Sequence, residues 1–163
     1  MVNSMGQTLA IVALVATMPA AIAQSHQHST QGHPAPAGSV ADERVLVKFP
    51  EPMRIHMLAN MRDHLLALQE IQGALAGQHY DRAADTAEQR LGMSSLKLHG
   101  AHEVAGFMPE AMQAIGTGMH QAASRLAVSA SDAAATGDLK PVLEAMAQVT
   151  AQCVACHASY RAQ

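Results

Sequence analysis

Large apolar side chains recur at steps of three and four residues along most of this chain, beginning just after Phe49-Pro50. A repeat of this kind lines one face of an α-helix and does not fit a strand, whose side chains alternate with a period of two. Because Pro52 suits a first helical turn and Gly77 suits a helix end, the sequence predicts a helix from about Pro52 to Ala76. Its predicted buried stripe consists of Met57, Met61, His64, Leu68, Ile71 and Leu75.

Three further segments are expected to be helical: 81 to about 98, 109 to about 135, and 138 to the C-terminal end, with residues 99–109 as a loop or broken turn. The last of these carries a stripe made of Leu139, Val142, Met146, Val149, Cys153, Cys156 and Tyr160. The chain has two Phe, two Tyr and no Trp, which leaves little material for a sheet. We therefore expect an all-α domain, folded as an antiparallel, up-and-down four-helix bundle.

Residues 1–23 have the form of a secretory signal peptide. The apolar run 9–18 is followed by Ala21-Ile22-Ala23, which puts small residues at the two positions that a signal peptidase reads. Cleavage after Ala23 would leave a periplasmic protein without stable membrane insertion; an uncleaved membrane anchor is the alternative.

Residues 24–48 are rich in Ser, Gln, His and Pro at their start and are expected to form a flexible linker, which leaves residues 49–163 for the helical domain. Three histidines of the linker, His26, His28 and His33, could bind copper or zinc weakly.

Charge excludes one class of function. The formal net charge is −3 and no cluster of Lys or Arg is present, whereas binding to nucleic-acid phosphates needs a basic patch. The acidic residues are scattered and form no pair of the kind that hydrolysis uses. We expect neither nucleic-acid binding nor enzymatic activity.

The residues Cys153-Val154-Ala155-Cys156-His157 form the C-x-x-C-H signature of covalent haem attachment. Random placement of the two cysteines and ten histidines would produce this pattern on the order of once in a thousand chains. Two thiols one helical turn apart can each add to a vinyl group of the same porphyrin, and the next imidazole then reaches the iron. The motif predicts one haem c per chain, held by Cys153 and Cys156, with His157 as the proximal iron ligand.

Other uses of the two cysteines fit the sequence less well. A disulfide between them would close a very small loop within a helix and add little stability. A thioredoxin-type pair stands at the start of a helix in a βαβ context, and a zinc site needs further ligands at matching spacing. Disulfide exchange is the main alternative to haem.

The C-terminal sequence CVACHASYR, at the end of four predicted helices, resembles that of the class II c-type cytochromes, the cytochrome c′ group. The resemblance spans about residues 49–161. It implies a haem inside the bundle, with Tyr160 and Arg161 at the positions of the aromatic and basic residues that follow the motif in that group. It also implies that Arg161 lies near the proximal His157 or a haem propionate, and that the protein forms a homodimer through its first two helices.

The same resemblance places Met61 opposite the distal face of the haem. High-spin members carry a non-bonding Leu, Phe or Met there, whereas low-spin relatives use a Met thioether as sixth ligand, so Met61 fits both. Met57 stands where the group usually has a basic residue. A propionate contact is then expected from Arg54 or Arg62.

Four histidines outside the motif and the linker bear on iron ligation. His64 shares the helical face of Met57 and Met61 and could bind iron, but a histidine on a core stripe is more often hydrogen-bonded within the core. The other three are expected at the surface: His99, His102 and His120.

Three functions follow as hypotheses. The first is a one-electron carrier that exchanges electrons with redox partner proteins in the periplasm. The second is a high-spin module that binds NO or CO in an apolar distal pocket. The third is a non-haem periplasmic protein in which the linker histidines bind metal and the cysteines act as thiols.

Overall fold

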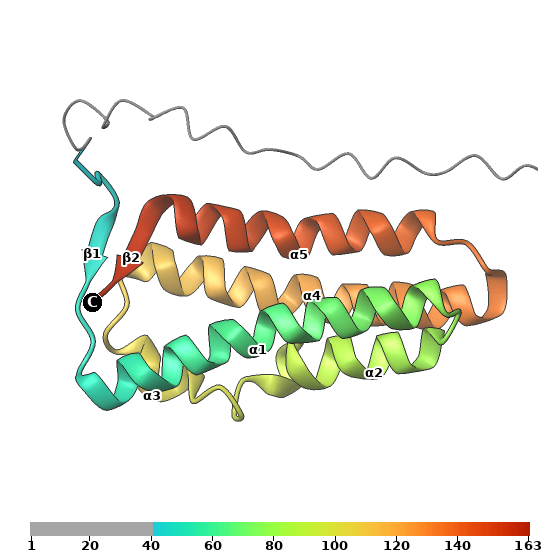
Figure 1. The fold of residues 1–163 in the computed structure, drawn as a ribbon, viewed down its shortest axis with the longest axis horizontal. Helices are drawn as coiled ribbons and strands as arrows, with labels where there is room; N and C mark the ends of the chain where they lie inside the picture. Colours follow the sequence, from blue (N-terminus) through green and yellow to red (C-terminus); the bar gives the residue numbers. More distant parts are fainter. Residues whose placement is uncertain (1–40) are drawn as a thin grey trace, which may run out of the picture. The chain divides into compact units, whose positions relative to one another are not determined.

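The computed structural model describes residues 41–163, and this part of the chain is predominantly helical (Figure 1). The elements are β1 (Val45–Val47), α1 (Glu51–Ala76), α2 (Tyr80–Arg90), the 3-10 turn η1 (Met93–Ser95), α3 (Ala101–Ala105), α4 (Glu110–Thr136), α5 (Lys140–Ser159) and β2 (Tyr160–Ala162). The predicted all-α class is confirmed. The predicted signal peptide, residues 1–23, and the first part of the predicted linker lie outside the described residues. Within residues 41–163, no helix combines the length and apolar character that a membrane span requires.

Helix α1 agrees with its prediction to within one residue at each end. Pro52 lies in its first turn, and the Gly77 N–H closes its end by donating to the Gly73 carbonyl at 3.1 Å. The predicted stripe faces inward over most of its length, with Met57, His64, Ile71 and Leu75 buried and Met61 and Leu68 partly buried.

Helix α2 ends at Arg90, earlier than the predicted end near Leu98. The Gly92 N–H donates to the Ala87 carbonyl at 2.8 Å, five residues back, so the regular helical step is lost there. A Cβ at this position would collide with the Glu88 side chain, which is why only glycine fits the turn. The turn η1 and the short helix α3 then occupy residues that were expected to be helix or loop.

Helix α4 follows its predicted boundaries closely, whereas α5 ends at Ser159, so Tyr160, predicted on its buried stripe, lies in β2 instead. Pro109 precedes α4, and Gly137 ends it in the left-handed conformation with φ +71°. The N-cap residue of α5 is Leu139, and the Asp138 carboxylate just before it accepts the Lys140 N–H at 2.9 Å.

The main core lies between the long helices and is built largely from alanine. α4 packs against both α2 and α5, and α1 packs against α2. Consecutive long helices run in opposite directions (Figure 1). Small side chains let helices approach closely, so the core needs few large residues. The largest fully buried apolar side chains are Ile71, Leu91, Leu126, Val142 and Val149.

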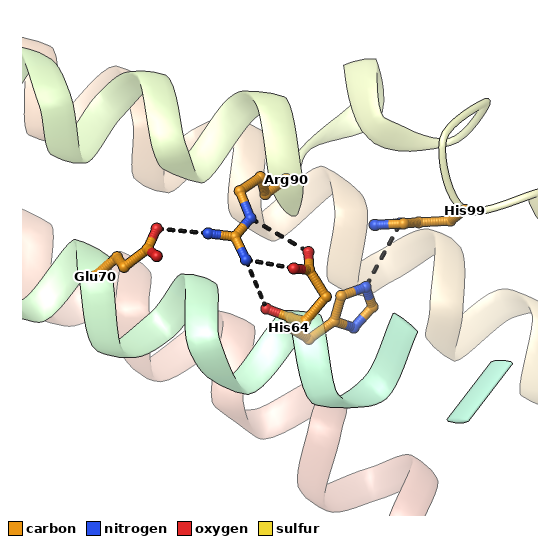
Figure 2. A network of polar contacts seen from close by, with 5 residues as sticks. His64, Glu70, Arg90 and His99 are labelled. Atoms are coloured by element: carbon orange, nitrogen blue, oxygen red, sulfur yellow. Dashed lines mark hydrogen bonds and ion pairs between the residues drawn. The ribbon is translucent and has the colours of Figure 1, made fainter. Parts of the chain in front are cut away.

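Arg90 connects the end of α2 to α1. Its guanidinium donates to the carboxylates of Asp63 and Glu70 and to the Asp63 carbonyl at 3.4 Å (Figure 2). These side chains are partly exposed, so the network contributes modestly to stability and mainly fixes how the two helices lie together.

Two short strands that the sequence did not predict join the ends of the described chain. β1 and β2 pair in parallel with Val45 opposite Tyr160, and Gln163 extends the pairing by donating to the Val47 carbonyl at 3.0 Å. β1 therefore lies inside residues 24–48, which were expected to be linker throughout. Beside the strands, a second apolar cluster forms from the buried residues Val47, Phe49, Met57 and Val104.

Candidate functional site

The two cysteines lie near the end of α5, one turn apart. Cys153 and Cys156 are free thiols and partly buried, and His157 is exposed. The Cys153 thiol donates to the Val149 carbonyl at 3.5 Å. The helical spacing therefore presents both sulfurs from one side of α5, as the sequence predicts.

The end of α5 is fixed by the segment that contains β1. Tyr160 leaves the helix in an extended conformation, with φ −130° and ψ 150°, and begins β2. Arg44 donates from Nη1 to the His157 carbonyl at 3.3 Å, which places a cation at the carbonyl end of the helix. Arg161, expected near His157 or a propionate, lies with its Nε 3.5 Å from Asp42 Oδ2.

Both cysteines are protonated thiols at neutral pH. Burial raises the pKa of Cys153, and burial together with the neighbouring Cys153 raises the pKa of Cys156. Redox-active cysteine pairs have lowered pKa values and lie at helix N-termini, where the helix dipole stabilises a thiolate. The pair on α5 has raised pKa values and lies near the C-terminal end of its helix, which argues against thiol–disulfide exchange.

The motif lies between the two apolar clusters. Cys153 packs against the main core, whereas Tyr160 packs against the cluster that contains Met57. Met57 is thus a core residue of the second cluster, and Met61, one turn later on α1, is partly buried and belongs to neither cluster.

Two glycines of α4, Gly116 and Gly118, lie at about the same height along the helices as the cysteines of α5. A Cβ on Gly118 would lie 3.1 Å from Gln152 Oε1, so α4 and α5 approach closely beside Cys153. Because the two helices run in opposite directions, Gly116 lies level with the residues that follow Gln152. A Cβ on Gly116 would find no heavy atom within 4 Å, although Gly116 is on the face of α4 that carries Met119.

These observations fit a haem. The donor set, two neutral thiols at i and i+3 followed by an imidazole, is the one that attaches and ligates haem c. At the same level on α4, a Cβ on Gly116 would meet no heavy atom within 4 Å, so no side chain packs against this position.

Arg54 and Arg62 were expected to reach a propionate. Arg54 is held by Glu51, to which it donates from Nε at 2.9 Å and from Nη2 at 2.8 Å. Arg62 is exposed. Arg62 is therefore the freer of the two.

The expectation for two of the remaining histidines was wrong. His99 and His120 are buried rather than at the surface, whereas His102 is exposed as predicted. Burial follows from the fold of residues 91–100, which turn back over α1 and α4 so that His120 donates to the Leu91 carbonyl at 2.8 Å. One feature of the sequence could have indicated that His120 is buried. It lies at helical spacing on the same face of α4 as three alanines, Ala123, Ala127 and Ala130.

His64 completes a group with these two residues, which we call the histidine cluster: His64, His99 and His120. His64 Nε2 lies 3.5 Å from His99 Nδ1, in agreement with the favoured expectation of a histidine hydrogen-bonded in the core. Within residues 41–163, no three His, Cys, Asp or Glu side chains are arranged to hold a metal ion by themselves.

Two surface hollows lie away from the cysteines. One of about 570 Å³ is lined by residues 78–82 and Ala134, at the turn between α1 and α2. The other, of about 460 Å³, lies between α2 and α4 and includes Glu88 and Ser124. Neither hollow contains a residue of the motif, so the candidate site is defined by its donor set, Cys153, Cys156 and His157.

Comparison of the chain with protein-family models, with curated proteins and with solved structures finds no match.

Proposed function

We propose that this protein is a periplasmic c-type cytochrome that carries single electrons between redox partner proteins. In this proposal haem c is bound by thioether links to Cys153 and Cys156, His157 is the proximal ligand, and the four long helices form the antiparallel bundle of the class II c-type cytochromes. The observation that carries the proposal is the position of two free, partly buried thiols one turn apart on α5, followed directly by the exposed His157.

Each part of the chain has a defined role in this proposal. The bound haem supplies a one-electron Fe(III)/Fe(II) couple. The cysteines fix its position relative to α5, and Arg44, through the His157 carbonyl, fixes the end of the helix that carries the proximal imidazole. The apolar clusters on either side of the motif exclude water, which helps set the potential.

Met61 decides between the two haem functions. Its thioether takes part in neither apolar cluster, which leaves it free to be the sixth ligand, and axial Met favours electron transfer by raising the potential. The second candidate is NO or CO binding at a high-spin iron, for which Met61, a partly buried side chain of α1, would pack without ligating.

Haem attachment is tested on the exported, purified protein. The wild-type chain should keep its haem after denaturation, shown by a pyridine haemochrome spectrum and by a mass above that of the peptide. The double variant Cys153→Ala, Cys156→Ala should have the plain peptide mass. A colourless wild-type protein of plain peptide mass would refute the proposal.

Ligation is tested by absorption spectra of both oxidation states. His157→Gln should change the spectrum, whereas His102→Gln, at an exposed histidine of α3, should not. Met61→Leu should convert a low-spin ferric spectrum to a high-spin one, with Met57→Leu as the control for a change in packing alone. A wild-type spectrum that is high-spin and shifts with CO or NO would replace the carrier by the gas-binding function.

A further inference from the structure

The histidine cluster joins three separate parts of the fold. His64 belongs to α1, His99 follows η1 and His120 belongs to α4, and their exposed fractions are 9%, 6% and 8%. The ring centroids of His64 and His99 are 4.7 Å apart, those of His99 and His120 are 5.5 Å apart, and those of His64 and His120 are 6.2 Å apart. Figure 2 shows the His64 ring reaching from α1 toward His99. The cluster is separate from the cysteine motif and has no part in haem binding as proposed above.

The hydrogen bonds of the cluster fit neutral imidazoles. A carbonyl oxygen only accepts, so His120 must donate from Nδ1 to Leu91. The Ser95 hydroxyl donates to the carbonyl three residues before it at 2.7 Å, which leaves its oxygen to accept from His99 Nδ1 at 3.3 Å. His64 Nε2 faces the same His99 nitrogen and is then an acceptor without a proton.

An added proton would have no acceptor. His99 Nε2 is buried and has no hydrogen-bond partner, so protonation there would create a buried, unsatisfied N–H group. Protonation of His64 at Nε2 would direct the new N–H at the Nδ1–H group of His99. In either case a positive charge would be buried beside two further imidazoles, which is costly in an apolar setting.

The charged groups around the cluster do not compensate for such a proton. Asp63 of α1 is next to His64, but its carboxylate is already paired with Arg90 of α2. His56 of α1 faces the His99 carbonyl, and Glu103 of α3 lies beside Gly100. Burial, followed by the neighbouring His99 and His120, lowers the pKa of His64 to about 4, and burial likewise lowers the pKa of His99.

The segment that carries His99 is held mainly by polar contacts. His56 Nε2 and Asn60 Nδ2 both hydrogen-bond to the His99 carbonyl at 3.0 Å. The side chains of Met93 and Leu98 are exposed, and in residues 92–100 the buried side chains are those of Ser95 and His99. A segment with so little buried apolar surface opens more easily than the helices around it.

We propose that the histidine cluster is a pH-dependent contact, in which neutral imidazoles hold residues 92–100 against α1 and α4 and proton uptake in mildly acidic solution releases them. The long helices stay folded in this transition. The device goes beyond electron transfer or gas binding and does not depend on either.

Hydrogen exchange of the purified full-length protein, measured by mass spectrometry and corrected for the intrinsic exchange rate, tests the proposal. Opening would return the pKa of His64 from about 4 to its ordinary 6.5, so protection of residues 92–100 should fall roughly thirty-fold between about pH 7.5 and about pH 5. Peptides from α4 and α5 should keep their protection at both pH values.

His64→Leu should abolish most of this pH dependence, whereas the control His102→Gln should leave it unchanged. Equal protection of residues 92–100 at both pH values, loss of protection in α4 and α5 at the same pH, or full pH dependence in His64→Leu would each overturn the proposal. The wild-type comparison decides by itself if the leucine variant does not fold.

Discussion

Replacing Gly116 by leucine tests most directly where a haem lies against the helices. Gly116 and Gly73 are both glycines of helix interiors at which an added Cβ meets no heavy atom within 4 Å. Gly73 is exposed on α1, whereas Gly116 is on the face of α4 level with the cysteines. Gly116 is partly buried as well, so the chain without haem serves as the reference in which effects of packing alone are measured.

In the polypeptide without haem, made as the Cys153→Ala, Cys156→Ala variant, both leucines should stabilise the fold. Glycine is about 0.5–1 kcal/mol less favourable than a good helix former in a helix interior. For a domain of this size that corresponds to a rise in Tm of roughly 2–5 °C. No side chain has to move to admit the first atom of the new residue.

In the haem protein the two variants should diverge. Gly73→Leu should keep its gain in Tm, but Gly116→Leu should put a bulky side chain where the porphyrin packs and lose about 1–3 kcal/mol, as overpacked cores do. Its haem content per chain should fall, or its Soret band should shift. Thermal unfolding followed by circular dichroism, with haem measured as the pyridine haemochrome, gives both readouts.

Equal gains in Tm for the two leucine variants, with an unchanged spectrum at Gly116→Leu, would refute the reasoning. The haem would then not lie against α4 at this level. The assignment of the cysteines would survive, since their double variant tests it independently.

Three further outcomes follow from the burial of particular side chains. The pKa of His64 is lowered from 6.5 to about 4, so the stability that the neutral imidazole contributes is present above pH 6.5 and is lost as the pH falls toward 4. Urea unfolding should show a decrease of about 3 kcal/mol in the free energy of unfolding over this range. His64→Phe should make that decrease smaller. In the chain without haem, the raised pKa values of Cys153 and Cys156 should make alkylation by iodoacetamide at neutral pH slower than in the urea-unfolded chain, and equal rates would contradict their burial. Leu126→Ala should cost about 2–5 kcal/mol of unfolding free energy because Leu126 is fully buried, whereas Val128→Ala, at an exposed position of the same helix, should change it by less than about 0.5 kcal/mol.

Helix boundaries could be predicted where local chemistry sets them. α1 and α4 begin after prolines and end before glycines, and both signals act within a few residues. α2 was predicted too long because the apolar repeat continues past Gly92, while the close approach of Glu88 that forces the turn there is visible only in three dimensions.

The β1–β2 pair could not be predicted for a related reason. Three-residue strands have no alternating pattern long enough to recognise, and Val45 meets Tyr160 only after all the helices have packed. Long-range contacts of this kind leave no trace in a local window of sequence.

The candidate site and the histidines near it likewise include one feature that the sequence predicts and one that it does not. The spacing of Cys153 and Cys156 was enough to place both on one side of a helix, because helical geometry alone determines it. The burial of His99 and His120 depends on how residues 91–100 fold back over two helices. Histidine has an intermediate tendency to be buried, so its residue type did not indicate which outcome would hold.

The pairing of Val45–Val47 with Tyr160–Ala162 means that this strand pair can form only after both segments, more than a hundred residues apart, have been synthesised. The first strand is synthesised long before its partner, so Arg44 and Val47 have no partners at the end of α5 until residues 157–163 have been made. Removing residues 160–163 would take away the partner strand and leave the Val47 carbonyl without the Gln163 N–H, whereas Arg44 would keep the His157 carbonyl. A tag joined directly to Gln163 would therefore lie beside this strand pair.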